Sequence, residues 1–135
     1  MTGRKPLPQN FHWVLARAKC SAANVFKELE LGIRDDVEKA QSLVEKHETI
    51  VFSVSQTQNN RFSVLRVDDP ITSASESVDF SCINSAILVH GEGVNMCALL
   101  TLTNDGECKL RVEDDELDQW QFRKMALQKL FFRIP

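Results

Sequence analysis

Residues 113–133 read EDDELDQWQFRKMALQKLFFR, and this stretch decides the fold because its apolar residues surround a predicted helix almost completely. At about 100° per residue, one stripe contains Leu117, Trp120, Leu127, Phe131 and Ile134, and another side contains Phe122, Met125, Ala126 and Leu130. A helix that is apolar nearly all round is normally surrounded by protein. The pattern therefore predicts a long C-terminal helix that a curved sheet grips, that a partner chain covers, or that closes over a ligand.

The charges of this predicted helix follow the order that a helix dipole favours. Residues 113–118 are mostly acidic, whereas Lys124, Lys129 and Arg133 follow towards the end. Acidic residues stabilise the N-terminus of a helix and basic residues stabilise its C-terminus. Because the acidic cluster has this structural explanation, we predict no metal site there, and we expect no cofactor.

Before that helix, the chain has the two-residue period of β-strands, with apolar and polar residues in alternation. The predicted strands are residues 49–54, 62–64, 78–82, 87–90, 96–103 and 108–112. Asn104, Asp105 and Gly106 give the strongest hairpin signal in the chain. Strands that follow one another in this way are expected to pair as neighbours in an antiparallel meander.

Two structures compete for residues 11–20, because their apolar residues fit both a strand and a helix. A helix would join the next segment into about 37 residues, far above the mean of roughly 11–12, so we predict a strand. Ser21 is expected to cap the helix that follows. Within that helix, Gly32 and the capping-box spacing of Asp35 and Glu38 predict a bend.

The predicted fold class is α+β. It comprises a curved antiparallel sheet of about six to seven strands, a bent helix pair after the first strand, and a long C-terminal helix packed on the sheet, which is the element order of a helix-grip arrangement. Residues 1–9 are predicted to form a mobile tail. Residues 10–135 are predicted to form one domain, since 135 residues correspond to a single domain.

Composition and charge exclude several classes of function. A net charge of −3 gives no basic face for nucleic acid, and the apolar runs are too short to span a membrane. We recognise no secretory signal peptide, and we therefore expect a cytoplasmic protein. The cysteines are then expected to be reduced thiols in the core. They are Cys20, Cys82, Cys97 and Cys108.

The aromatic residues suggest a ligand site, because the chain has eight Phe and two Trp but no Tyr. Rings without a hydroxyl group suit a dry environment, and a cavity between the sheet and the last helix would hold a small apolar ligand. The candidate ligand-binding residues are Phe52, Phe80, His90, Trp120 and Phe122. The competing interpretation is that the same rings fill the core, which is more common in a chain of this length.

Catalytic motifs are absent from the sequence, and we predict no catalytic residue. His90 precedes Glu92 at a glycine-flanked turn, where a His-x-Glu pair has poor geometry for sharing a metal or a proton. Cys20 next to a helix start is the one candidate for an activated thiol. An enzyme that uses His90 or Cys20 with an acidic partner remains the weaker alternative.

The hairpin also predicts an interface. Pairing Thr103 with Cys108 puts Leu100 and Leu102 on the outward face of the sheet, where they would form a homodimer interface. We therefore expect a small cytoplasmic, non-enzymatic binding protein, which is either a homodimer or the carrier of a small apolar ligand between the sheet and the C-terminal helix. An accessory or inhibitor protein for one protein partner is the alternative.

Overall fold

A computed structural model describes residues 10–69, 71, 74–91 and 93–133, so the predicted tail of residues 1–9 lies outside the described residues. The helices are α1 (Trp13–Lys19), α2 (Ala22–Ser42) and α3 (Gln119–Phe132). The strands are β1 (Val51–Gln58), β2 (Arg61–Asp69), β3 (Ala74–Ile83), β4 (Ala86–Gly91), β5 (Val94–Leu102), β6 (Cys108–Val112) and β7 (Asp115–Leu117). This content confirms the α+β class.

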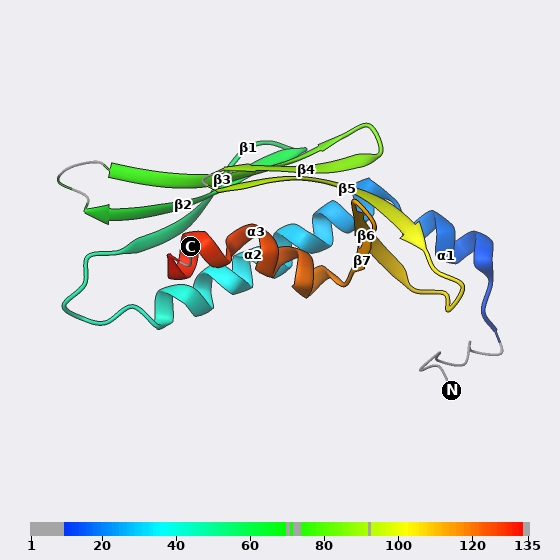
Figure 1. The fold of residues 1–135 in the computed structure, drawn as a ribbon, viewed down its shortest axis with the longest axis horizontal. Helices are drawn as coiled ribbons and strands as arrows, with labels where there is room; N and C mark the ends of the chain where they lie inside the picture. Colours follow the sequence, from blue (N-terminus) through cyan, green and yellow to red (C-terminus); the bar gives the residue numbers. More distant parts are fainter. Residues whose placement is uncertain (1–9, 70, 72–73, 92, 134–135) are drawn as a thin grey trace.

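The seven strands form one antiparallel sheet in the order β1-β2-β3-β4-β5-β6-β7, which is the predicted meander. Figure 1 shows α2 and α3 next to each other against one face of the sheet, which we call the inner face. The other face, which we call the outer face, carries no helix among the described elements (Figure 1). The predicted packing of the C-terminal helix on the sheet is therefore confirmed.

The N-terminal prediction was wrong, because most of residues 11–20 form α1 instead of a strand. α1 has no buried residue, so no tertiary contact requires the two-residue alternation that suggested a strand. Ser21 begins α2 as predicted, and its hydroxyl accepts the N–H of Asn24 at 3.2 Å. This cap separates α1 from α2, so the long single helix that argued against a helical assignment does not form.

α2 continues through Gly32 as one helix and is not divided into the predicted pair of shorter helices. The side chain of Arg123 on α3 lies against Gly32: a Cβ atom there would be 2.1 Å from Nη1 of Arg123, so a larger residue would make this flexible side chain shift. The guanidinium of Arg123 forms an ion pair with Asp36 at 2.8 Å, one turn further along α2. Burial is the largest influence on Asp36 and raises its carboxyl pKa, although Arg123 opposes this shift.

The C-terminal helix is shorter than predicted. Residues 115–117 form β7, and α3 begins after Asp118. Asp118 and Gln121 form a capping box, in which the Gln121 side chain accepts the N–H of Asp118 at 2.9 Å. The acidic stretch is thus an edge strand and a helix cap, not the first turns of the helix.

The core lies between the inner face of the sheet and the two long helices. The ring of Phe62 on β2 is stacked on Phe80 of β3, with centroids 5.0 Å apart, and contacts Phe26 of α2 at 5.2 Å. All three rings are buried. α3 closes the core with Phe122, Ala126, Leu127 and Leu130.

The predicted pairing of β5 with β6 was wrong by one residue. Leu102, not Thr103, pairs with Cys108, and Leu100 pairs with Leu110. A shift of one residue exchanges the two faces of a strand, so Leu100 faces inward and packs against the core. The leucine of β5 that is exposed on the outer face is Leu99, whose relative accessible surface is 52%.

The cysteines do not all fit the expectation of reduced core thiols. Cys20, between α1 and α2, forms a disulfide with Cys108 of β6. Cys97 is an exposed free thiol on the outer face, and only Cys82 fits the expectation, because burial raises the pKa of its thiol. Disulfides are typical of oxidising compartments, so this bond does not support the cytoplasmic location, which stays a prediction.

Candidate functional site

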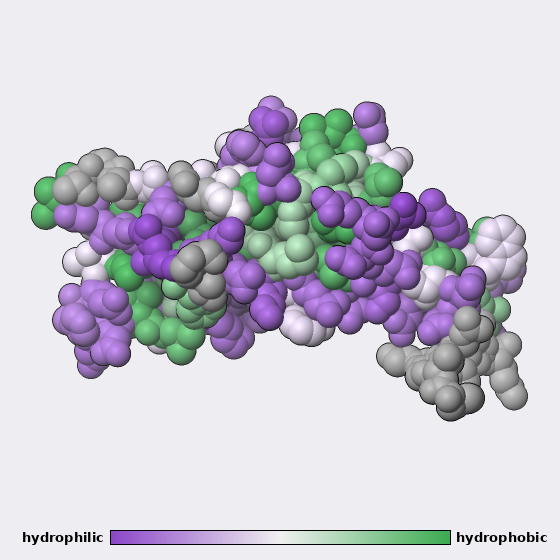
Figure 2. All heavy atoms as spheres, viewed as in Figure 1, coloured by the Kyte–Doolittle hydropathy of each residue, from purple (hydrophilic) through white to green (hydrophobic). Residues whose placement is uncertain are grey.

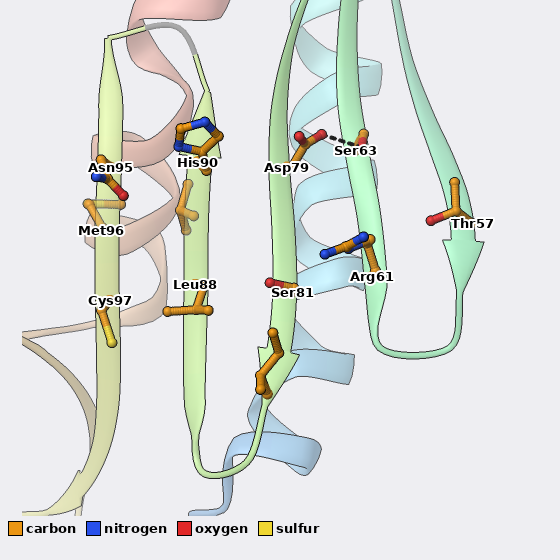
Figure 3. Close-up of a pocket in the computed structure, with 12 residues that line it drawn as sticks. Thr57, Arg61, Ser63, Asp79, Ser81, Leu88, His90, Asn95, Met96 and Cys97 are labelled. Carbon is orange, nitrogen blue, oxygen red and sulfur yellow. Dashed lines mark hydrogen bonds between the residues drawn. The ribbon is translucent and has the colours of Figure 1, made fainter.

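The outer face of the sheet contains an open hollow of about 760 Å³ that extends across β1 to β5 (Figure 3). Its lining residues come from all five strands and are mostly polar. They are Thr57, Arg61, Ser63, Asp79, Ser81, Ile83, Leu88, Val89, His90, Asn95, Met96 and Cys97. The volume lies within the range of roughly 300–1,000 Å³ that is usual for ligand sites.

The strand register places four polar residues in one row across the hollow. Ser63 pairs with Asp79, Asp79 with His90, and His90 with Asn95. Residues that are directly opposite in antiparallel strands have Cβ atoms about 4.5–5.5 Å apart, so the row brings side chains of β2 to β5 together. A second row on the same face lies two residues further along each strand and begins with Arg61 on β2 (Figure 3).

Two side chains of the row, Ser63 and Asp79, are hydrogen-bonded to each other. The hydroxyl of Ser63 donates to Oδ1 of Asp79 at 2.5 Å (Figure 3). A nucleophilic serine would need a histidine base that accepts its proton. Here the serine hydroxyl is bonded to the carboxylate, and His90 lies on the far side of Asp79, so the row does not have the connectivity of a Ser-His-Asp triad.

Other side chains in the hollow have hydrogen-bonding capacity that the described part of the chain does not use. Arg61, His90 and Asn95 are exposed, and none of their side chains hydrogen-bonds or forms an ion pair with another described residue. The guanidinium of Arg61 is directed from β2 towards β3 (Figure 3). The exposed thiol of Cys97 lies at the β5 side of the same hollow.

The five predicted ligand-binding residues do not form one site. Phe52, Phe80 and Phe122 are buried members of the core, which matches the alternative that the rings fill the core. His90 lies on the opposite face of the sheet, in the hollow. Trp120 lies on the surface of the helix pair with 56% of its area exposed.

Trp120 borders a smaller, apolar groove of about 330 Å³ on the outside of α2 and α3. Leu43 and Phe132 also line this groove, and both are exposed. Figure 2 shows that apolar residues, in green, reach the surface between hydrophilic ones on the side of the molecule seen in Figure 1.

The sequence prediction missed most of the hollow. Arg61, Ser63, Asp79 and Asn95 are the polar members of alternating strands, and the alternation assigns them to the outer face. The alternation is the one sequence signal that places these residues on the outer face. It does not show that they lie close together, because that depends on the strand register. Neither a motif nor a spacing in the sequence links residues on four different strands.

Comparisons with known proteins give no relative: no family model, no curated protein and no solved structure matches this chain. Within the described residues, none of the helices combines the length and the apolar character needed to cross a membrane. The same residues contain no group of three or more His, Cys, Asp or Glu side chains suited to hold a metal ion.

Proposed function

We propose that this chain is a non-enzymatic binding protein that holds an acidic peptide segment of a protein partner in the outer-face hollow. The observation that supports this function is the exposed guanidinium of Arg61, which has no partner in the described part of the chain and lines the same hollow as His90 and Asn95. The proposal keeps the predicted class of binding protein. It moves the ligand from the inner face of the sheet to the outer face.

The chemistry of the lining favours a carboxylate. Arg presents a planar set of N–H donors that bind a carboxylate in a bidentate manner. The side chains of Asn95 and His90 can add N–H donors within the same hollow. Asp79 also lines the hollow and accepts a hydrogen bond from Ser63, but its negative charge opposes an acidic ligand, so the attraction comes from Arg61.

The shape of the hollow favours a peptide over a compact small molecule. The hollow is open, and it extends across several strands of a sheet face that no described helix covers (Figure 3). Leu88 and Ile83 provide apolar surface between the polar side chains. A peptide with one acidic side chain and apolar neighbours would contact both kinds of surface.

The proposal is tested by titrating the isotope-labelled chain with short capped peptides that differ at one position, which carries Glu, Gln or Lys. We expect the Glu peptide to shift the NMR signals of the Arg61 Nε–H and the Asn95 side-chain amide, and the Lys peptide to bind most weakly. A charge-assisted hydrogen bond contributes about 1.5–3 kcal/mol, so Arg61→Ala should weaken binding about tenfold or more.

Arg111→Ala is the matched control, because Arg111 is an exposed arginine on β6 that does not line the hollow. This control should bind the Glu peptide with nearly wild-type affinity. Equal losses in the two variants would show a diffuse electrostatic effect and contradict the proposed site. Binding of the Lys peptide as tightly as the Glu peptide would also contradict it.

A further inference from the structure

The two edges of the sheet differ in their protection against pairing with another chain. β7 is three residues long and carries Asp115 and Glu116, and both shortness and charge protect a sheet edge. β1 is eight residues long, and residues 49–60 contain neither a charged residue nor a proline. The edge at β1 therefore lacks most of the features that discourage strand pairing. The exceptions are an irregularity between Gln56 and Gln58 and the contact of α2 with Ile50 and Phe52.

Gln41 of α2 shows which backbone groups of β1 point away from β2. Its side-chain amide donates to the carbonyl of Ile50 at 3.1 Å and accepts the N–H of Phe52 at 2.7 Å. Alternate residues of an antiparallel strand direct their backbone groups to the same side. The N–H groups of Val54 and Gln56 therefore also point away from β2, and no described residue pairs with them along this edge.

We propose that this free edge pairs with β1 of a second copy of the chain, in an antiparallel arrangement centred on Val54. A two-fold axis at that position aligns Val54 with its own symmetry mate and Phe52 with Gln56 of the second copy. The free groups then form about four hydrogen bonds between the two strands. Gln41 has to release the N–H of Phe52 on pairing, because its Oε1 occupies the position that the Gln56 carbonyl of the second copy takes in this register.

The absence of charge favours a second copy as the occupant of this edge. In a two-fold pairing the residue on the axis faces its own copy, so a strand that carries charges of one sign would bring like charges together, which is destabilising. In the proposed register, Ser53 faces Ser55 of the second copy, and the strand has no charge to repel. An acidic or basic peptide would find no complementary charge there.

The area of contact indicates a weak dimer. A stable interface buries about 1,600 Å² in total, and a single pair of edge strands buries less. We therefore expect dissociation near the micromolar range, so that sedimentation velocity at about 100 µM detects the dimer and dilution to about 1 µM reduces it.

Two charge variants test the register. Ser53→Lys with Ser55→Lys puts lysines directly opposite each other in the proposed dimer, and Ser53→Glu with Ser55→Glu does the same with acids. Each variant alone should be monomeric at the concentration at which the wild type dimerises. An equimolar mixture should restore a dimer, because each lysine then faces a glutamate. Ser75→Lys with Ser85→Lys is the control that adds the same charge at exposed positions away from β1.

The results separate the proposal from its alternatives. A wild type that remains monomeric at about 100 µM, lysine and glutamate variants that still dimerise, or a mixture that stays monomeric would each overturn it. If the variants fail to fold, NMR of the wild type tests the pairing. The backbone N–H signals of Val54 and Gln56 should shift with protein concentration, and unchanged signals would overturn the proposal. Arg61→Ala should dimerise normally, so the failure of the peptide site and the failure of the dimer are distinguishable.

Discussion

Reduction of the disulfide between Cys20 and Cys108 should lower the free energy of unfolding by several kcal/mol. The disulfide closes a loop across a sequence separation of 88 residues. In the chain-entropy description, cross-linking a loop of this length lowers the entropy of the unfolded chain by an amount that corresponds to about 4.6 kcal/mol at 25 °C. Native disulfides in small domains contribute about 2–5 kcal/mol when measured, so we expect a loss within that range.

Urea unfolding of the chain with and without reductant measures this loss. With a dependence of about 2 kcal/mol per molar urea, a loss of 2–5 kcal/mol should lower the unfolding midpoint by about 1–2.5 M. The double variant Cys20→Ser/Cys108→Ser should match the reduced chain, and reductant should not change it further. Cys97→Ser is the control, because Cys97 is an exposed free thiol. An unchanged midpoint in a chain whose reduction is verified by mass would refute the reasoning.

Two other predictions concern the packing of the core and the pH dependence of stability. Phe80→Ala should lower the free energy of unfolding by about 3–5 kcal/mol, since Phe80 is fully buried and stacked on Phe62, and urea unfolding measures the change; a loss below about 1 kcal/mol would contradict its place in the core. Hydrogen bonding to Arg66 lowers the pKa of Asp68, and a carboxyl with a lowered folded-state pKa stabilises the fold above about pH 4 and loses this effect as the pH falls through the folded-state pKa. Asp68→Asn should therefore be less stable than the wild type at pH 6, by less than about 1 kcal/mol because the side chain is partly exposed, and the difference should vanish near pH 2.

The parts of the fold that were predicted correctly depend on burial along one chain segment. The strands alternate because one face of each packs on the core, and Ser21 caps α2 through a local contact. The errors occur where other forces decide. α1 has no buried residue to impose a pattern, and Gly32 lies against the Arg123 side chain of another helix, a contact that the local sequence does not reveal.

The register error has a local cause in the hairpin loop. Asn104, Asp105 and Gly106 form a three-residue loop, closed by the N–H of Thr103 donating to the carbonyl of Glu107 at 2.8 Å. Gly106 has a φ of 81°, the left-handed conformation that such loops place at their last position. The predicted pairing assumed a loop one residue longer, and that single residue reversed the faces of the leucines in β5.

The hollow and the free edge both involve β1, and this has a consequence for recognition. Antiparallel pairing about a two-fold axis normal to the sheet keeps both outer faces on the same side, so two hollows would face the same direction. Each hollow has one Arg61, and a single carboxylate contact gives modest affinity. A partner with two acidic segments would bind the second hollow at a high effective concentration. Weak self-association would then increase affinity for such a partner without adding any new contact within either site.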